Sequence, residues 1–507
     1  MSYTFPTSRL TSIFIVVLWG GCQFIGGLDD LRLDPGASGG AGGDSGGVGG
    51  ISGVSSSVST GTNGVGGADG GPPVAAVWSK QFGDGSAQYV TDVAVDAAEN
   101  IFVAGSFGGT LDFGNGMTLV SNVDLDAFLV KLDPNGDPIW VKKFGGAGPD
   151  RIESLSLTKN GDPVVGGSFN GLMTVDTKNF SYNGGLDGFL IRFSSATGTL
   201  VWGDRFGDAQ NQRCAAVDVA QTADDILCFG DFGGVATFGT TSITSMGAND
   251  LFLVRYTANG TVSSVMRAGD SDEQSARSLA VNTSGLAHAA AKFDGKLEWG
   301  MQTSAGQGDV FLGQFPTSGM PSWTLRMGNA STQQPNGLSL IPGAGSTVLV
   351  GEFEGACDFG GKAVSSIGGF DAFITRVDAM GAVTWMRTIG DADANQGTDD
   401  QYAADVAAMG DGNVFVTGYV AGTVNFGSGL ISGPGDTDLF VMRLDPSGQT
   451  LWSFRSGSGD SQYGRAIALS GPDELVVAGD FRGTLDLGND PLINPASSDI
   501  FIAKLKR

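Results

Sequence analysis

Residues 126–145 read DAFLVKLDPNGDPIWVKKFG, two short apolar runs on either side of the sequence PNG. Both runs are rich in β-branched and aromatic residues, which favour strands, and Pro-Asn-Gly is a common turn sequence. This stretch therefore predicts a β-hairpin. The same pattern recurs along most of the chain, so this hairpin is the unit from which we infer the fold.

Two sequence markers define the repeat. Tryptophans recur at intervals of 62, 62, 121, 62 and 67 residues, at Trp78, Trp140, Trp202, Trp323, Trp385 and Trp452. The interval of 121 residues is about two periods, so the missing copy falls near Val265. The motif Asp-x-Phe occurs in register with the tryptophans, beginning at Asp126, Asp187, Asp250, Asp309, Asp371, Asp438 and Asp499. The markers predict seven units.

Each unit has two further predicted strands before the hairpin. In the first unit they are VTDVAVD (90–96) and NIFVAGSF (100–107), and no segment has a helical period. Units of four short strands cannot bury both faces alone, so they stack radially as blades. The glycine that recurs in the second strand, as in VAGSF, is expected to allow close approach of neighbouring backbones. The sequence predicts an all-β fold, a seven-bladed β-propeller of four-stranded antiparallel blades.

The ends of the repeat series predict how the ring closes. An additional strand, VWSKQF (77–82), precedes the first full unit and matches the last strand of the other units. The seventh unit ends at IFIAKLKR (500–507) without such a strand. We expect the N-terminal strand to complete the last blade, which removes an exposed sheet edge. The propeller domain is predicted to span residues 74–507.

The pattern FGG…D…VAGSF-x-GTLDFG…DAFLVKLD-x-NG…W resembles the bacterial SBBP β-propeller repeat family over residues 74–507. The segment DPNGDPIW (133–140) is also similar to quinoprotein-type propeller repeats and to the lipoprotein scaffold of outer-membrane assembly built from them, although those repeats are shorter. The first resemblance implies an extracytoplasmic propeller, mostly without a defined activity. The fourth blade departs most, since it is expected to lack the repeat tryptophan and has Trp299 where other blades have phenylalanine.

The first residues are typical of an export signal. Arg9 precedes an apolar run from Leu10 to Trp19 that is too short to span a bilayer, and two glycines and Cys22 follow. This ending resembles a bacterial lipobox, in which the cysteine is lipidated, although Trp19 stands where leucine is usual. Residues 1–22 are predicted to be a signal peptide with Cys22 as the lipidation site. The alternative is ordinary cleavage, which yields a soluble exported protein.

Residues 23–73 are rich in glycine and serine, as in GASGGAGGDSGGVGG (36–50). Such a segment has almost nothing to bury and behaves as a flexible coil. We expect a disordered tether that separates the propeller from its anchor. The protein is therefore expected to be exported and lipid-anchored in the bacterial cell envelope, at the outer membrane or cell surface, or secreted if the lipobox is not used.

The composition disfavours several classes of function. The chain has 53 acidic against 28 basic residues and a net charge of −25, which repels the phosphate backbone of nucleic acids. It has four cysteines and one histidine, too few for the usual clusters of zinc ligands. No G-x-S-x-G nucleophile elbow follows a predicted strand, and no Cys/His pairing is present. We expect no enzyme activity, no cofactor and no nucleic-acid partner.

The loop after each tryptophan strand carries a polar residue about ten places after the tryptophan. These residues are Gln88, Asp150, Gln212, Gln274, Gln334, Gln401 and Gln462, with Gln401 displaced by an insertion. In a ring of repeats they lie on one face, which they share with acidic residues such as Asp84 and Asp208. We predict that this face binds the ligand. The alternative is that each side chain satisfies loop backbone groups.

The insertion in the sixth blade is a candidate calcium site. Asp391, Asp393 and Asn395 have the spacing of the oxygen ligands in calcium loops. However, Gln396 stands where the turn glycine is expected and no glutamate follows at the twelfth position, so we favour a solvated acidic loop. The similar segment DPNGD (133–137) is more simply a hairpin turn.

Four other features have structural interpretations. Cys214 and Cys228 fall on neighbouring predicted strands, where a disulfide can form in an oxidising compartment and two buried thiols are the alternative. Cys357 has no evident mate. His288, in LAHAAAKF, is expected to be a packed core residue rather than a base. The aspartate of each Asp-x-Phe motif is expected to end a loop by accepting backbone N–H groups.

These features favour an extracytoplasmic binding or scaffold module of the cell envelope whose ligand the sequence does not identify. Its partner is expected to be a protein or a glycan of the envelope, and its contact with the membrane is expected to be through a lipid anchor only. The alternative is a secreted carbohydrate-active propeller, a lyase or glycosidase, because such an enzyme needs only two carboxylates at the right separation.

Overall fold

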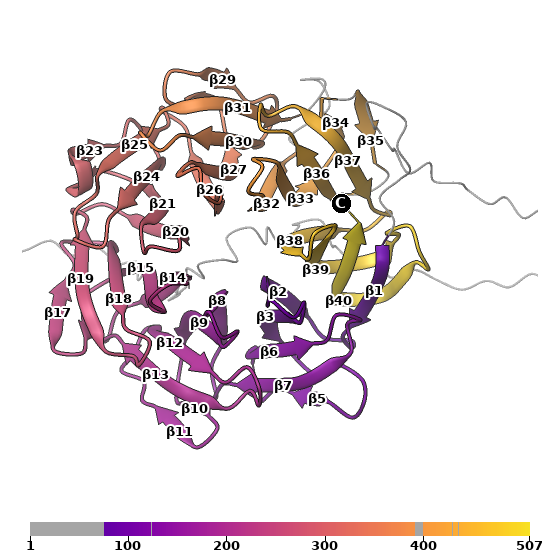
Figure 1. The fold of residues 1–507 in the computed structure, drawn as a ribbon, viewed down its shortest axis with the longest axis horizontal. Coiled ribbons are helices and arrows are strands. Elements are labelled where there is room, and N and C mark those ends of the chain that lie inside the picture. Colours follow the sequence, from indigo (N-terminus) through magenta and orange to yellow (C-terminus); the bar gives the residue numbers. More distant parts are fainter. Residues whose placement is uncertain (1–75, 123, 391–398, 428, 434–435, 507) are drawn as a thin grey trace, which may run out of the picture. The chain divides into compact units, whose positions relative to one another are not determined.

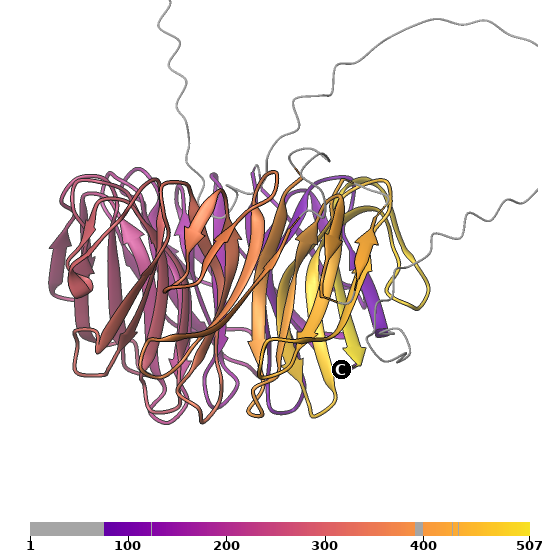
Figure 2. The same cartoon turned by 90° about the horizontal axis from the view of Figure 1, so that it is seen from above.

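The computed structural model describes residues 76–122, 124–390, 399–427, 429–433 and 436–506. These residues form seven four-stranded antiparallel sheets arranged as blades in a ring (Figure 1). Seen from the side, the strands of each blade run between the two faces of the ring (Figure 2). The predicted seven-bladed β-propeller is therefore confirmed. Residues 1–75, which carry the predicted signal peptide, Cys22 and most of the predicted tether, lie outside the described residues.

Each blade has an inner strand next to the central axis and a second strand behind it. From blade 1 to blade 7, the inner strands are β2 (Gln88–Val95), β8 (Asp150–Leu157), β14 (Gln212–Ala220), β20 (Gln274–Val281), β26 (Gln333–Leu340), β32 (Gln401–Ala408) and β38 (Gln462–Ser470). The second strands are β3 (Ile101–Phe107), β9 (Pro163–Phe169), β15 (Asp225–Phe232), β21 (Ala287–Phe293), β27 (Thr347–Phe353), β33 (Val414–Val420) and β39 (Glu474–Leu485).

The predicted hairpin supplies the outer half of each blade. The third strands are β6 (Asp126–Leu132), β12 (Asp187–Phe193), β18 (Asp250–Tyr256), β24 (Asp309–Phe315), β30 (Asp371–Val377), β36 (Asp438–Leu444) and β40 (Leu492–Lys506). The outer strands of blades 1 to 6 are β7 (Pro138–Phe144), β13 (Leu200–Phe206), β19 (Val262–Ala268), β25 (Trp323–Met327), β31 (Val383–Ile389) and β37 (Thr450–Ser456).

A small hairpin that the sequence pattern did not predict joins the second and third strands of blades 1 to 6. Its strands are β4 (Thr110–Asp112) with β5 (Thr118–Val120), β10 (Met173–Val175) with β11 (Lys178–Phe180), β16 (Val235–Phe238) with β17 (Thr241–Thr244), β22 (Lys296–Leu297) with β23 (Gln302–Thr303), β28 (Ala356–Asp358) with β29 (Ala363–Ser365), and β34 (Thr423–Asn425) with β35 (Leu430–Ser432). In blade 7, β39 and β40 are longer and continue this pairing themselves.

The ring closes as predicted. Strand β1 (Ala76–Phe82) pairs antiparallel with β40 and is the outer strand of blade 7, so the sheet order is β1-β40-β39-β38. The indole Nε1 of Trp78 donates a hydrogen bond of 3.1 Å to the carbonyl oxygen of Pro134 in blade 1. In addition, Lys80 Nζ lies 2.7 Å from Asp137 Oδ1. The N-terminal strand therefore connects the last blade to the first.

The repeat tryptophans form the same contact at other joints. In four of them the indole Nε1 donates to a carbonyl oxygen in the outer hairpin of the next blade at 2.9–3.1 Å, namely Trp140 to Ser195, Trp202 to Ala258, Trp323 to Ala379 and Trp385 to Pro446. The tryptophan rings lie over glycines of these hairpins. At Gly136, for example, φ is +76° and a Cβ would lie 2.8 Å from the Trp78 ring. A side chain there would be both strained and in collision with the ring.

The blade that lacks the repeat tryptophan is blade 3, which corrects the prediction of blade 4. In β19, Ser264 faces Arg255 at the register position that tryptophan occupies in other blades. Blade 4 has its tryptophan, Trp323, facing Gln314. Its Trp299 is in a short 3-10 helix (Trp299–Met301), is buried, and packs against Phe315 at 5.0 Å between ring centroids. It fills the place of the smaller hairpin phenylalanine of other blades.

The core lies between the facing sides of adjacent blades. One buried cluster combines Phe107 and Phe128 of blade 1 with Val476 and Ile502 of blade 7. The structure places similar clusters between other neighbouring blades, as expected for units that cannot bury both faces alone. No helix among the described residues is long and apolar enough to cross a membrane.

Candidate ligand site in the central channel

Each inner strand contains a β-bulge at the same place. In β2, Val90 pairs with Gly105 and Asp92 pairs with Ala104, so Thr91 has no partner in β3. The residues skipped in this way in the seven blades are Thr91, Glu153, Ala215, Arg277, Asn336, Ala404 and Arg465. A bulge leaves one residue out of the ladder and re-aims its side chain. We call these seven residues the bulge ring.

The bulge ring borders a cavity of about 400 Å³ between the inner strands, which surround the middle of the propeller (Figure 1). All seven members line this cavity, and Asp92, Asp218 and Asp405 add three carboxylates. Serine hydroxyls and the amide of Asn336 complete a strongly polar lining, with no aromatic residue among the described residues that line it. Such a cavity suits a hydrophilic ligand.

A glycine behind the bulge makes room for it. A Cβ on Gly105 would lie 2.0 Å from the carbonyl oxygen of Tyr89, and one on Gly479 would lie 1.9 Å from that of Tyr463. Both carbonyls belong to the inner strand of the same blade, just before the bulge. The predicted close backbone approach is present, and in these blades it accommodates the bulge.

Three carboxylates of the cavity fasten one blade to the next. Each accepts a hydrogen bond of 2.6–2.9 Å from a backbone N–H in the inner strand of the following blade, Asp92 from Leu155, Asp218 from Val281 and Asp405 from Ile467. An inner strand is the edge of its sheet, so its outward N–H groups need such acceptors. These aspartates therefore have a structural role.

Burial makes these carboxylates bind protons more readily than in water. Burial, and after it the negative charge of Asp405, raises the pKa of Asp92 to about 7. Burial also raises the pKa of Asp405 to about 6, and the N–H groups of Ile467 and Val406 oppose this rise. Both effects follow from the cost of a charge in a poorly solvated site.

Glu153 differs from these aspartates. Its side chain lines the cavity and has no hydrogen bond or ion pair with another described residue. Burial raises the pKa of its carboxyl group, and the charges of Arg213 and Arg151 oppose the rise. Since no hydrogen bond from another described residue satisfies this carboxylate, it is available to a ligand.

The two arginines of the bulge ring line the cavity and also make contacts within the protein. Arg277 Nη2 donates to Gln334 Oε1 at 2.8 Å. Arg465 Nε donates to Asp480 Oδ1 at 2.8 Å, and its guanidinium lies 4.6 Å from the centre of the Tyr463 ring. Both guanidinium groups are therefore held in fixed positions at the edge of the cavity.

The glutamines that were predicted to form a ligand-binding ring are the first residues of inner strands, on one face of the propeller, but their side chains are buried. Gln88 is 0% exposed, and its Nε2 donates to Asp84 Oδ1 at 2.9 Å and to the Gly108 carbonyl at 3.1 Å. Gln212 contacts its own loop in the same way, and Gln274, Gln401 and Gln462 are also 0% exposed. The geometry therefore matches the alternative in which these amides hold the loops. No observation tests ligand binding by them, which stays a prediction.

One member of that ring needs correction and one is chemically different. The residue equivalent to Gln88 in blade 5 is Gln333, which pairs with Phe353 as Gln88 pairs with Phe107, and not Gln334. In blade 2 the position is occupied by Asp150, which is fully buried. Burial raises the pKa of Asp150 to about 8, although its carboxylate accepts a hydrogen bond from the N–H of Gly146.

The repeated Asp-x-Phe aspartates are buried loop caps, as predicted. Asp126 Oδ2 accepts hydrogen bonds from the backbone N–H of Asn122 at 2.8 Å and from Lys143 Nζ at 3.0 Å. Asp187 accepts the equivalent bond from Asn183 at 3.0 Å. These repeated contacts explain why the residue recurs in every blade, and they leave it no role toward a ligand.

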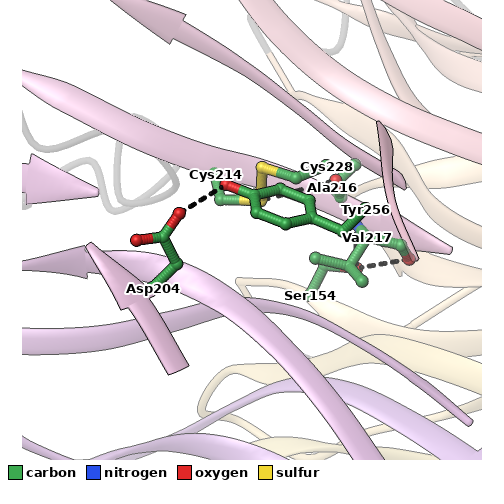
Figure 3. The surroundings of a disulfide bond; sticks show 7 residues. All are labelled: Ser154, Asp204, Cys214, Ala216, Val217, Cys228 and Tyr256. Carbon is green, nitrogen blue, oxygen red and sulfur yellow. Dashed lines mark hydrogen bonds between the residues drawn. A yellow bond between two sulfur atoms is a disulfide. The ribbon is translucent and has the colours of Figure 1, made fainter. Parts of the chain in front are cut away.

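Cys214 and Cys228 form a disulfide between β14 and β15, with their Cα atoms 5.8 Å apart (Figure 3). Of the two possibilities left by the sequence, the structure shows the bonded one. The bond lies beside blade 2, where a Cβ on Gly166 would be 2.6 Å from Cys214 Sγ. Close by, the N–H of Val217 donates to Ser154 Oγ at 3.1 Å across the same joint (Figure 3). The disulfide thus secures the inner strand next to its bulge.

The remaining reactive side chains are part of the core. His288 is 0% exposed, contacts Gln314 Nε2 at 3.0 Å through its Nε2, and meets Trp323 edge-on at 5.4 Å. Burial lowers the pKa of His288 to about 4. Cys357 is buried and free, and burial raises the pKa of its thiol to about 12. The predicted core position of His288 is confirmed.

The predicted calcium ligands Asp391, Asp393 and Asn395 lie outside the described residues. Within the part of the chain that the structure describes, no group of three or more His, Cys, Asp or Glu residues is arranged to hold a metal ion. The hairpin turn at 133–137 is as predicted, because Asp133 Oδ1 accepts hydrogen bonds from the N–H groups of Asn135 and Asp137.

Sequence reasoning missed the bulge ring. A signal was present, since the fourth residue of each inner strand varies between blades in polarity, charge and size, as at Thr91, Glu153 and Ala215, whereas the first residue is nearly constant. A bulge does not break the alternation of apolar residues strongly enough to be recognised without the pairing partner.

Residues 77–106 match the SBBP family, described as a beta-propeller repeat. The chain therefore contains an SBBP β-propeller repeat, as the resemblance predicted. A curated relative is "Uncharacterized WD repeat-containing protein L264" of Acanthamoeba polyphaga mimivirus, which is 27% identical over 106 residues. That match covers 20% of this chain and 8% of the viral protein.

Solved structures with a similar arrangement include a quinohemoprotein alcohol dehydrogenase from Comamonas testosteroni. It is 10% identical, with a TM-score of 0.41, over 87% of this chain and 77% of the enzyme. Sqt1 from Chaetomium thermophilum is 13% identical, with a TM-score of 0.38, over 78% of this chain and 94% of its own. Similarity at this level carries no argument about the site.

Proposed function

We propose that this protein is a binding module of the bacterial cell envelope that takes up its ligand in the central channel, and that it is not an enzyme. The observation that carries the proposal is the contrast between two sets of equivalent positions. The aspartates of the Asp-x-Phe motif are identical in all seven blades, as positions with a structural role are expected to be. The bulge ring holds Thr, Glu, Ala, Arg, Asn, Ala and Arg.

This variation is not explained by the needs of the fold. The bulge has the same register in every blade, so the backbone makes the same demand at each of the seven positions. The carboxylate of Glu153, which lines the cavity and has no hydrogen bond to another described residue, also costs desolvation free energy unless something binds it. A set of different side chains held at one level of a channel is what recognition of an asymmetric ligand requires.

The predicted export signal and tether support the location in this proposal. A propeller on a flexible tether of about 50 residues, anchored through Cys22, would reach ligands at some distance from the membrane. The disulfide between Cys214 and Cys228 is consistent with folding in an oxidising compartment. The partner is then a protein or a glycan of the envelope.

A photo-crosslinking residue placed at different positions of the full chain in cells tests the proposal. One variant carries a diazirine amino acid of leucine's size in place of Leu340, which lines the cavity, and the control carries it in place of Met380, which is 83% exposed on a hairpin turn. The proposal expects a discrete crosslinked product from position 340 that position 380 does not give. Products from position 380 alone would overturn it.

The anchor is tested in the same cells. Replacing Cys22 by serine is expected to release the protein from the membrane fraction and to leave the crosslink from position 340 unchanged. Retention of the serine variant in the membrane fraction would overturn lipid anchoring.

A further inference from the structure

The chemistry of the channel narrows the class of ligand. The cavity lining carries the carboxylates of Asp92, Glu153, Asp218 and Asp405 together with the guanidinium groups of Arg277 and Arg465. A simple cation would meet the arginines and a simple anion would meet the carboxylates, so neither matches the whole lining. An apolar ligand would remove water from these charged groups and offer them no hydrogen bonds in return.

Several polar groups of the cavity make no hydrogen bond within the described part of the chain. They are the carboxylate of Glu153, the hydroxyls of Thr91 and Ser278, and the Oδ1 atom of Asn336, none of which has a hydrogen bond to another described residue. These groups come from four different blades, so they surround the cavity. Two of them only accept hydrogen bonds and two are hydroxyls that both donate and accept.

Two other positions of the bulge ring have small side chains. Ala215 and Ala404 are the members of the bulge ring with the smallest side chains, and they lie in blades 3 and 6 on roughly opposite sides of the ring. Their small size leaves the cavity open between the polar groups. Substituting either residue with a larger one would fill the space and remove no hydrogen-bonding group.

We propose that the channel binds a saccharide unit, with Glu153, Asn336 and Thr91 as hydrogen-bonding partners of its hydroxyl groups. A sugar hydroxyl donates to a carboxylate or amide oxygen and accepts from a guanidinium or hydroxyl, so one polyhydroxylated ring satisfies both kinds of group in the lining. Hydrogen bonds to charged groups are the stronger ones, which makes Glu153 the main contributor. This inference rests on the proposed function and specifies its ligand.

The test uses the full chain and a defined panel of sugars: glucose, galactose, mannose, N-acetylglucosamine, glucuronic acid and their β-linked disaccharides. Saturation-transfer NMR identifies binders, and calorimetric titration gives the affinity. Glu153→Gln keeps the size of the side chain and removes its charge, and is expected to weaken binding about tenfold or more. Ala404→Gln fills the cavity and is expected to abolish binding.

Matched controls separate the channel from the rest of the surface. Glu354→Gln and Ala98→Gln make the same changes at exposed positions and are expected to leave the affinity unchanged. If Ala404→Gln does not fold, as judged by its thermal midpoint, Thr91→Gln provides a second way to narrow the cavity.

Each outcome decides the proposal. Binding that is lost in the Glu153 and Ala404 variants and retained in both controls supports a saccharide site in the channel. Binding that none of the channel variants affects overturns the site, and the absence of any binder in the panel overturns the ligand class. A crosslink from position 340 to a protein, together with no sugar binding, would refute the saccharide and leave the proposed binding function standing.

Discussion

The indole Nε1 of Trp78 lies 3.1 Å from the carbonyl oxygen of Pro134, although the two residues belong to the last and the first blade of the ring. The Trp78 ring also covers Gly136 in the same hairpin turn of blade 1. This contact repeats the one made by Trp140 and Ser195 between blades 1 and 2. At the closing joint, however, the strand that carries the tryptophan pairs with β40 but is not connected to it by a hairpin turn, because β1 and β40 lie at opposite ends of the propeller sequence.

Trp78→Ala is therefore expected to open the closing joint. The lost packing and hydrogen bond should reduce the free energy of unfolding by roughly 2–4 kcal/mol, because the side chain is only half-buried. Hydrogen exchange followed by mass spectrometry should show faster exchange in peptides from β40, which loses part of its protection when β1 detaches. Trp140→Ala is the matched control, since it weakens a joint without freeing a terminal strand. Equal exchange of β40 in both variants would contradict this account.

Asp150→Gln is expected to stabilise the protein. The glutamines at the equivalent positions hold their loops as neutral amides. A glutamine at position 150 could accept a hydrogen bond from the backbone N–H of Gly146, as Gln212 Oε1 accepts one from the backbone N–H of Asp208. The pKa of Asp150 is raised to about 8 in the fold, above its unfolded value near 3.8. The folded state therefore binds the proton more tightly, so stability is highest at low pH and falls as the pH rises from about 4 to about 8.

The stability gained in the Asp150→Gln variant should accordingly grow with pH and reach on the order of 2–4 kcal/mol at pH 7. Denaturant unfolding at pH 5 and at pH 8 measures this difference. The reverse substitution, Gln212→Asp, should introduce the same pH dependence in blade 3. A gain that is the same at both pH values would show that the carboxyl group is not responsible.

The disulfide is expected to stabilise blade 3. It joins residues 14 positions apart, and closing a loop of that length contributes about 3 kcal/mol in the chain-entropy model. Cys214→Ala together with Cys228→Ala should lower the free energy of unfolding by about that amount. Reductant present during unfolding should destabilise the wild-type protein and have no further effect on the double variant. Equal sensitivity of the two proteins to reductant would refute this assignment.

His288 should stay neutral well below its usual titration range. It is the single histidine of the chain, so its imidazole resonances in an NMR spectrum are unambiguous. They should not change between pH 8 and pH 5 in the folded protein, because burial lowers the pKa to about 4, whereas in urea they should titrate near pH 6.5.

This depressed pKa also affects stability. Between about pH 4 and pH 6.5 the unfolded state binds the proton and the folded state does not, so His288 makes the protein less stable as the pH falls through that range. The loss should total about 3 kcal/mol and be absent in His288→Phe. A His288→Phe variant with the same acid sensitivity as the wild type would rule out this contribution.

The regular features of the fold follow from repetition in the sequence. The tryptophan interval and the Asp-x-Phe motif were sufficient to predict seven blades and the closing role of residues 77–82, because each marker makes a contact that recurs around the ring. The prediction was wrong where a blade departs from the repeat. The tryptophan of blade 3 is replaced by Ser264, and assigning that strand to blade 3 required the pairing of β18 with β19.

The candidate site was harder to predict for a physical reason. The glutamines were predicted to bind the ligand because they recur. Recurrence, however, marks positions that the architecture needs, and Gln88 is buried in its loop. Glu153 and Arg277 face the cavity only because a bulge re-aims them. The presence of a bulge depends on the neighbouring strand, which a local sequence pattern does not contain.

The bulge has a further consequence for how such a molecule can change. A residue that a bulge leaves out of the strand ladder can be exchanged without altering the pairing of the two strands. Here seven such residues line one cavity. Gene duplication and point substitution at these positions can therefore generate receptors of different specificity on an unchanged scaffold. For the same reason, a combinatorial library randomised at the seven codons should retain the propeller and yield binders for small hydrophilic molecules of many kinds.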